Sequence, residues 1–166
     1  MILLNKNNFG IFFIKQGILF FWFCWFFIAC LTNITDLSIA KNWISMTTFH
    51  SGNYSALEKV INIYHIPNTI LDLLFSLDIF AQGLAAILFF VASFCFWFEN
   101  KYTWPTINMA FGISLFLWSV FLIMEEIFIA YSYESTHSGL FMFELISLLT
   151  IHLIPHKTSR YTNFNR

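Results

Sequence analysis

The chain alternates between long apolar stretches and shorter polar connections. The apolar stretches cover residues 11–31, 70–98, 105–130 and 139–154. A helix of about 20 residues crosses the roughly 30 Å hydrocarbon core of a bilayer, because each residue adds about 1.5 Å. Apolar and polar side chains do not alternate with a period of two along these stretches, which argues against membrane β-strands. The pattern therefore predicts four transmembrane α-helices.

The longest connection, residues 32–68, has a pattern of its own. Glu58 follows Ser55 at the spacing of a capping box, which predicts a short helix from Ser55 to Tyr64. Residues 36–46 carry apolar side chains at helical spacing and predict a second short helix. We expect both to lie on the bundle as an outer cap. The predicted fold is all-α: one membrane domain, residues 1–166, an integral membrane four-helix bundle with short helices in the outer connection between spans one and two.

Composition supports lipid as the surroundings of this chain. Hydrophobic residues make up 58% of the sequence and charged residues only 10%, whereas soluble domains carry about 25% charged residues. The mean hydropathy is +0.71. The formal net charge is −1, so no basic surface indicates a nucleic-acid partner. The lipid bilayer is the partner that composition predicts.

The cations predict an orientation by the positive-inside rule. Lys41 and Lys59 lie in the long connection on one side. Lys15 lies one turn inside the first span, and we expect its ammonium group to extend to the nearer interface. Six cations belong to the other side: Lys6, Lys15, Lys101, Lys157, Arg160 and Arg166. Both termini are therefore predicted to be cytoplasmic.

The carboxylates gather on the opposite, outer side and suggest a candidate ligand site. Asp78 and Gln82 are four residues apart in span two and share a helix face. Glu126 in span three and Glu144 in span four lie at comparable depth, and Asp36 follows span one. Because a charge near the bilayer centre costs about 2.5–3.5 kcal/mol, such groups usually face the bundle interior. Together with outer histidines, they would suit a divalent metal, a proton relay or a polar headgroup.

A less specific interpretation stays open for the same residues. If span two begins at Ile79 and span three ends at Met124, then Asp78, Glu125 and Glu126 lie at the interface and are solvated. Neighbouring helix residues point about 100° apart, so at most one of Glu125 and Glu126 can face a common pocket. The chain has no phosphate-binding glycine loop and no recognisable catalytic motif. No cofactor is expected, since His152 is the one histidine well inside a span and a bis-histidine haem needs two.

Several short segments resemble a known family. Asn33-Ile34-Thr35-Asp36 directly follows span one, and Ile44-Ser45-Met46-Thr47-Thr48-Phe49 comes next. Leu117-Trp118, Glu126-Ile127-Phe128 and His137-Ser138-Gly139 follow farther along the chain. These segments resemble the bacterial "predicted small integral membrane protein" family, a four-span domain of unknown function. The resemblance covers roughly residues 31–143.

The resemblance implies a four-span fold in a bacterial inner membrane and draws attention to Asp36, Asp78 and Glu126. The chain departs from the family pattern in the Met-Thr-Thr segment, which lacks an acidic residue. Ile127 and Tyr131 also replace tryptophans. The family has no assigned activity, so no ligand chemistry follows from it.

Three functional hypotheses remain. The first is a non-catalytic accessory or assembly subunit of a membrane complex, which meets other membrane subunits through the aromatic face of span one. The alternative is a small carrier or sensor that binds a cation, proton or polar ligand in an outward-facing acidic pocket formed by Asp36, Asp78, Gln82, Glu126 and Glu144. A membrane-embedded enzyme or redox subunit has the least support, because no motif indicates one.

Overall fold

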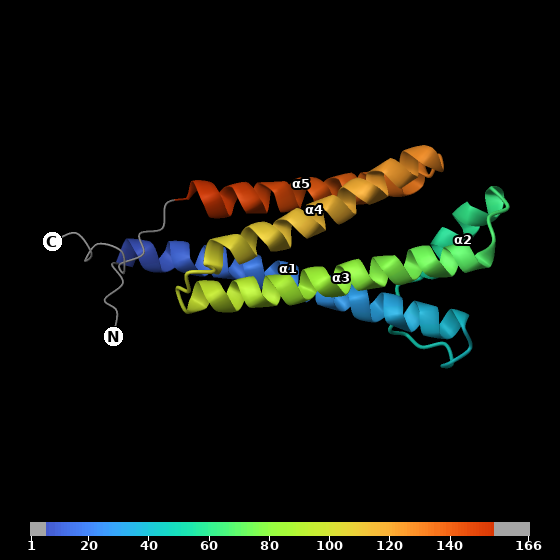
Figure 1. The fold of residues 1–166 in the computed structure, drawn as a ribbon, viewed down its shortest axis with the longest axis horizontal. Helices are drawn as coiled ribbons and strands as arrows, with labels where there is room; N and C mark the ends of the chain where they lie inside the picture. The colour runs from blue at the N-terminus through green and yellow to red at the C-terminus, as the bar shows by residue number, and fades with distance from the viewer. Residues whose placement is uncertain (1–5, 155–166) are drawn as a thin grey trace.

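The computed structural model describes residues 6–154, and all the regular secondary structure there is helical. Its helices are α1 (Lys6–Ala40), α2 (Asn53–Ile63), α3 (Asn68–Trp97), α4 (Thr103–Ile127) and α5 (Tyr131–Leu153). The four long helices run antiparallel and pack as a bundle (Figure 1). The short helix α2 lies at one end of the bundle, which we call the α2 end. The predicted fold class is confirmed.

Among the described residues, four helices are long and apolar enough to cross a membrane. These are α1 from Gly10 onward, α3, α4 and α5, with 31, 30, 25 and 23 residues. By length and composition the chain is a small polytopic membrane protein. Four of the helix ends differ from the sequence prediction by three residues or more. α1 begins at Lys6 and continues nine residues beyond Leu31, α4 stops at Ile127, and α5 begins eight residues before Gly139. The extensions of α1 beyond Leu31 and of α5 before Gly139 follow because polar residues without Gly or Pro do not end a helix.

The long connection contains one short helix among its described residues, rather than the two predicted. Residues 36–40 are the last turn of α1, so the prediction of a separate helix over 36–46 was wrong. The predicted capping box is also wrong. The N-cap of α2 is Gly52, and the Ser55 hydroxyl lies inside the helix, where it donates to the Gly52 carbonyl at 2.9 Å.

Each of the first four helices ends in the same kind of turn. The residues after α1, α2, α3 and α4 that adopt a positive φ are Asn42, His65, Glu99 and Ile129. At the end of α4, the Ala130 N–H reaches back to the Glu125 carbonyl at 2.8 Å, and the Ile129 N–H reaches the Glu126 carbonyl at 3.4 Å. This pair of bonds is the Schellman motif. It reverses the chain within a few residues and returns α5 antiparallel along α4.

An aromatic core joins α1, α3 and α4. The rings of Phe26 and Phe89 stack with centroids 5.8 Å apart, and Phe111 meets Phe89 edge-on at 4.9 Å. Trp118 closes the cluster at 5.7 Å from Phe26. Aromatic pairs in these geometries contribute about 0.5–1.5 kcal/mol each beyond area burial. The neighbours along the bundle are α1–α3, α3–α4 and α4–α5, and the α1–α5 contact is small.

Lys15 forms much of that small α1–α5 contact. Its side chain is only 1% exposed, so the ammonium group does not extend into solvent, and its place relative to the membrane interface stays a prediction. The ammonium group donates to the Ile151 carbonyl of α5 at 2.6 Å and lies 5.5 Å from the centre of the Trp104 ring. Residue 155 is a proline without an N–H, so the Ile151 carbonyl has no helical donor. Lys15 therefore caps the C-terminus of α5.

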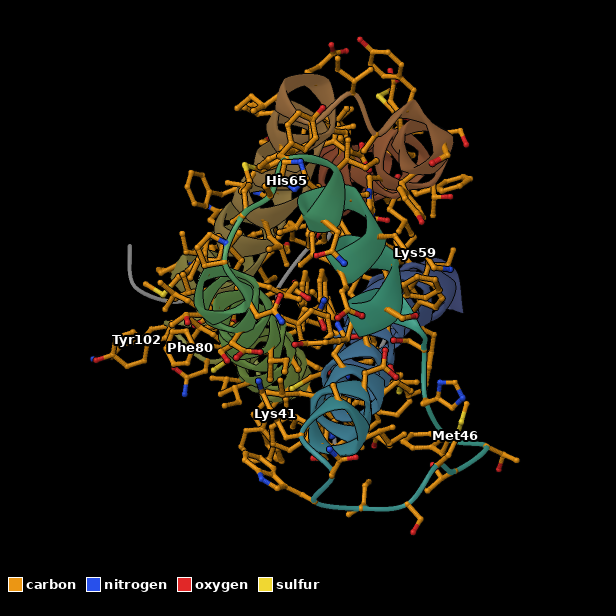
Figure 2. All side chains as sticks on the ribbon, turned by 90° about the vertical axis from the view of Figure 1, so that its right-hand side faces the viewer. Lys41, Met46, Lys59, His65, Phe80 and Tyr102 are labelled. Carbon is orange, nitrogen blue, oxygen red and sulfur yellow. The ribbon has the colours of Figure 1, made fainter. Side chains whose placement is uncertain are left out.

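The cations whose side chains the structure describes divide evenly between the two ends of the bundle, so they do not test the predicted asymmetry. Lys15 and Lys101 lie at the end opposite α2, while Lys41 and Lys59 lie at the α2 end (Figures 1 and 2). The side chain of Lys6, the predicted end of span four at Pro155, and the cations Lys157, Arg160 and Arg166 lie outside the described residues. The orientation in a membrane stays a prediction.

Candidate functional site

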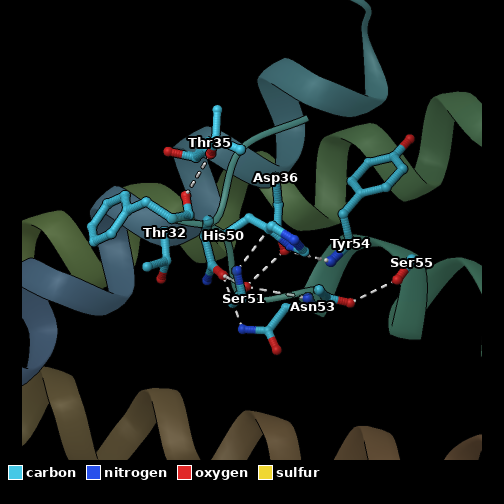
Figure 3. Close-up of polar contacts among 12 residues, drawn as sticks. Thr32, Thr35, Asp36, His50, Ser51, Asn53, Tyr54 and Ser55 are labelled. Carbon is cyan, nitrogen blue, oxygen red and sulfur yellow. Dashed lines mark hydrogen bonds and ion pairs between the residues drawn. The ribbon is translucent and has the colours of Figure 1, made fainter. Parts of the chain in front are cut away.

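Asp36, in the last turn of α1, accepts hydrogen bonds from residues before and at the start of α2. Its carboxylate accepts hydrogen bonds from the Ser51 N–H at 3.0 Å and the Ser51 hydroxyl at 2.7 Å (Figure 3). It also accepts from the Tyr54 N–H at 3.3 Å. The His50 Nδ1 atom lies 3.5 Å away. Gly52 has no side chain to cap α2, so Asp36 supplies the negative charge that a helix N-terminus favours.

Asn33, one turn earlier in α1, is the centre of a network that reaches α3. Its side chain is fully buried. The amide nitrogen donates to Asp78 Oδ2 and to Gln82 Oε1, both at 3.0 Å. The amide oxygen lies 2.9 Å from the Ser51 hydroxyl and 2.9 Å from Asn53 Nδ2. These contacts join α1, α3 and the start of α2.

Asp72 holds the same three helices nearer their ends. Lys41 forms an ion pair with Asp72 Oδ2 at 2.5 Å, and the Tyr54 hydroxyl donates to Asp72 Oδ1 at 2.8 Å. Lys41 follows α1, Tyr54 belongs to α2 and Asp72 belongs to α3. The pair is about one third exposed on each side, so solvent screens its attraction.

The Tyr54 phenol provides a pH-dependent test of this arrangement. Burial, with the hydrogen bond to Asp72 and the charges of Asp72 and Glu58, raises the pKa of Tyr54 to about 12, against about 10 in an unfolded chain. The folded chain thus favours the neutral phenol. The stabilisation is complete below pH about 10 and is lost as the pH rises towards about 12.

We therefore expect a phenol that ionises well above the ordinary pKa of about 10 when tyrosinate absorbance is followed with pH. That late step should be missing from Tyr54→Phe. The stability difference between wild type and Tyr54→Phe should also shrink as the pH rises above about 10. A late step that persists in Tyr54→Phe would contradict the assignment.

A cavity of about 370 Å³ opens beside this network at the α2 end. Two carboxylates, Asp36 and Glu58, line it together with Lys41 and His50. Asp36 already accepts several hydrogen bonds, so Glu58 and His50 are the groups with capacity left for a ligand. Within residues 6–154, no three His, Cys, Asp or Glu side chains stand close enough to hold a metal ion.

A second polar region lies between α4 and α5. Glu144 of α5 is fully buried and is hydrogen-bonded to the Ser114 hydroxyl of α4. Nearer the α2 end, Glu125 of α4 is 6% exposed and contacts His137 Nδ1 of α5. The His137 ring stacks on Phe121 with a centroid distance of 4.8 Å.

The residues of the predicted pocket therefore lie in separate parts of the bundle. Asp36, Asp78 and Gln82 belong to the network around Asn33. Glu144 faces α4 instead. Glu126 is exposed and lies apart from the others, because Glu125 is the residue that α4 turns towards α5. The five residues therefore do not converge on one pocket, and a ligand-binding role for them stays a prediction.

Sequence reasoning missed three groups that carry these contacts. They are Asn33, Ser51 and the Glu125–His137 pair. Asn33 could have been found from its spacing, since it lies three residues before Asp36 on the same face of α1. No family model, curated protein or solved structure matches the chain. The family resemblance of the sequence stays a prediction.

Proposed function

We propose that the chain is a non-catalytic membrane subunit that assembles with another membrane helix through the exposed face of α1. The observation that carries this proposal is a row of small residues on that face. Gly10, Gly17 and Cys24 recur every seven residues. A Cβ atom added at Gly10 or Gly17 would meet no atom within 4 Å. The row is therefore open to a neighbour from outside the chain.

Bulky side chains flank the row of small residues on both sides. Phe13, Phe20 and Phe27 follow it on one side, where Phe20 is 54% exposed. Ile14, Phe21 and Ile28 follow it on the other, where Phe21 is 53% exposed. Small residues between bulky ridges form a groove along the helix, and we refer to it as the α1 groove.

Helix association in lipid favours such a groove. Lipid tails are as apolar as the helix surface, so close van der Waals packing drives association, and small residues let two backbones approach. A seven-residue repeat matches helices that cross at about +20°. The partner that the α1 groove suits is a transmembrane helix with side chains that fill it.

A second candidate function is the carrier or sensor that binds a cation or polar ligand at the α2 end. The cavity beside Asp36 favours this function, because Glu58 and His50 line the cavity. Their hydrogen-bonded networks are less extensive than that of Asp36. The hydrogen bonds of Asp36, Asp78 and Gln82 count against it, since those groups are engaged in holding α1, α2 and α3 together.

The proposed location is a bacterial inner membrane, with both termini cytoplasmic. Support comes from the family resemblance and from the sequence, which assigns six cations to the side of the termini and two to the other side. In this orientation the α2 end faces outward, and the α1 groove is accessible from the lipid over the length of the span.

Gly17→Leu tests the assembly proposal. The added side chain would fill the α1 groove, so we expect the partner to be bound at least tenfold more weakly, a loss of about 1.4 kcal/mol. The measurement is the amount of partner that co-purifies with the full chain in mild detergent. Gly112→Leu is the matched control, because Gly112 is also an exposed helix glycine with no atom within 4 Å of an added Cβ.

The outcomes separate clearly. Loss of the partner in Gly17→Leu but not in Gly112→Leu supports assembly through α1. A wild-type chain that purifies as a monomer without any other membrane protein contradicts the proposal, and so does equal retention of the partner by both variants.

A further inference from the structure

The α4–α5 contact carries a line of polar groups that the proposed assembly through α1 does not use. Ser114, Trp118 and Glu125 are spaced by four and seven residues and share one face of α4. His137 and Glu144 are seven residues apart on α5, which corresponds to about 10 Å along the axis. The two rows face each other, since Glu125 contacts His137 and Ser114 contacts Glu144.

The deeper end of the line is built around Glu144. Its side chain is fully buried, and the indole of Trp118, itself 4% exposed, lies beside it. The Trp118 indole interacts with the Glu144 carboxyl group, and neither Glu144 Oε2 nor Trp118 Nε1 has another hydrogen-bond partner within the part of the chain that the structure describes. Buried polar atoms with so few partners draw water into a helix contact.

The hydrogen bonds around Glu144 indicate whether its buried carboxyl group is neutral or ionised. The Ser114 hydroxyl has one proton, and it lies 2.9 Å from the Ala110 carbonyl as well as against Glu144. A neutral Glu144 donates its own proton to the Ser114 oxygen, which leaves the serine proton for Ala110. An ionised Glu144 would compete with Ala110 for that proton and place a charge in apolar surroundings, which is unfavourable.

The other end of the line reaches solvent at the α2 end. The His137 side chain is 25% exposed, and its ring packs against both Phe121 and Trp118, with centroid distances of 4.8 Å and 5.9 Å. Glu125 Oε2 is buried, again without a hydrogen-bond partner among residues 6–154. Histidine changes charge near neutral pH and commonly passes protons between water and buried carboxylates.

We propose that Glu144 is a buried proton-binding site that exchanges with the aqueous phase at the α2 end, along the α4–α5 contact and through the Glu125–His137 pair. One proton moves in each step and no other bond changes. It passes from water to the imidazole, from the imidazole to the Glu125 carboxylate, and from there through water molecules beside Trp118 to the Glu144 carboxylate. Release follows the reverse order.

The other charged groups of the packed helices lie away from this line. Glu126 of α4 and Glu134 of α5 are exposed. Asp78 of α3 is bound to Asn33 and Gln82. Lys15 of α1 meets α5 at Ile151, which is seven residues beyond Glu144 towards the opposite end. The Glu125–His137 pair is therefore the titratable pair through which the α2 end reaches Glu144.

Infrared difference spectroscopy tests the proposal on the full chain in lipid nanodiscs. We expect a protonated-carboxyl C=O band that shifts on transfer to D₂O. Glu144→Gln, which has the size of the neutral acid, should remove this band, while Glu126→Gln should keep it. His137→Gln should keep the band but slow its exchange with D₂O at least tenfold. His152→Gln, a change at an exposed histidine at the far end of the same helix, should leave the exchange rate unchanged.

Two results would overturn the proposal. One is a protonated-carboxyl band that survives in Glu144→Gln, or the lack of any such band in the wild-type chain. The other is an exchange rate that His137→Gln leaves equal to that of the wild type. Neither result depends on whether a partner binds the α1 groove.

Discussion

Asn33→Leu should lower the free energy of unfolding by about 2–4 kcal/mol, since each buried polar group left without a partner costs about 1–3 kcal/mol. Asn33 is fully buried and lies within hydrogen-bond distance of four side chains, those of Asp78, Gln82, Ser51 and Asn53. Leucine has a similar volume and can make none of these bonds. Asp78 and Gln82 would keep only their bonds to each other.

The measurement is equilibrium unfolding of the purified chain in mixed detergent micelles, followed by helical circular dichroism. Thr35→Val is the matched control. Thr35 lies two residues from Asn33 on α1, but its hydroxyl donates only to the Leu31 carbonyl of the same helix, at 3.0 Å. We expect Thr35→Val to change stability by less than about 0.5 kcal/mol. Equal effects of the two substitutions would show that the network around Asn33 does not hold α1, α2 and α3 together.

The number of the spans could be predicted because hydropathy reports it directly. Where α1 and α5 end could not be predicted in the same way. Both helices continue into polar sequence that is stabilised by contacts with other segments, such as the bonds from Ser51 to Asp36 and to Asn33. Hydropathy marks where lipid contact is expected to stop, whereas a helix stops where its hydrogen bonds do.

In the candidate site, the sequence could predict some contacts but not others. Gln82 donates to Asp78 at 2.9 Å, as the spacing of four residues on one helix predicts. Whether Glu125 or Glu126 faces the interior depends on how α4 is rotated about its axis, and apolar residues surround both of them. That rotation follows from packing against α5, where His137 contacts Glu125. Pairs within one helix were predictable, but pairs between helices were not.

Lys15→Glu should have the largest effect of the substitutions considered, on the order of 3–5 kcal/mol of lost stability, the usual consequence of leaving a buried charge without a partner. The ammonium group of Lys15 lies against three features that favour a cation. These are the Ile151 carbonyl at 2.6 Å, the negative end of the α5 dipole and the face of the Trp104 ring at 5.5 Å. A carboxylate at the same place would be repelled by each of them.

Lys15→Met separates the charge from the shape of the side chain. Methionine keeps an unbranched apolar stem but leaves the Ile151 carbonyl without its donor, so we expect a smaller loss of about 1–3 kcal/mol. Lys59→Glu is the control for charge reversal, because Lys59 is exposed on α2 (Figure 2). It should change stability by less than about 0.5 kcal/mol. Unfolding in mixed micelles gives the stability, and spin labels on α1 and α5 near Lys15 and Ile151 report whether the two helices separate. If Lys15→Glu left both the stability and that distance unchanged, Lys15 would not be the cap of α5, and α1 and α5 would have to be held together by apolar packing alone.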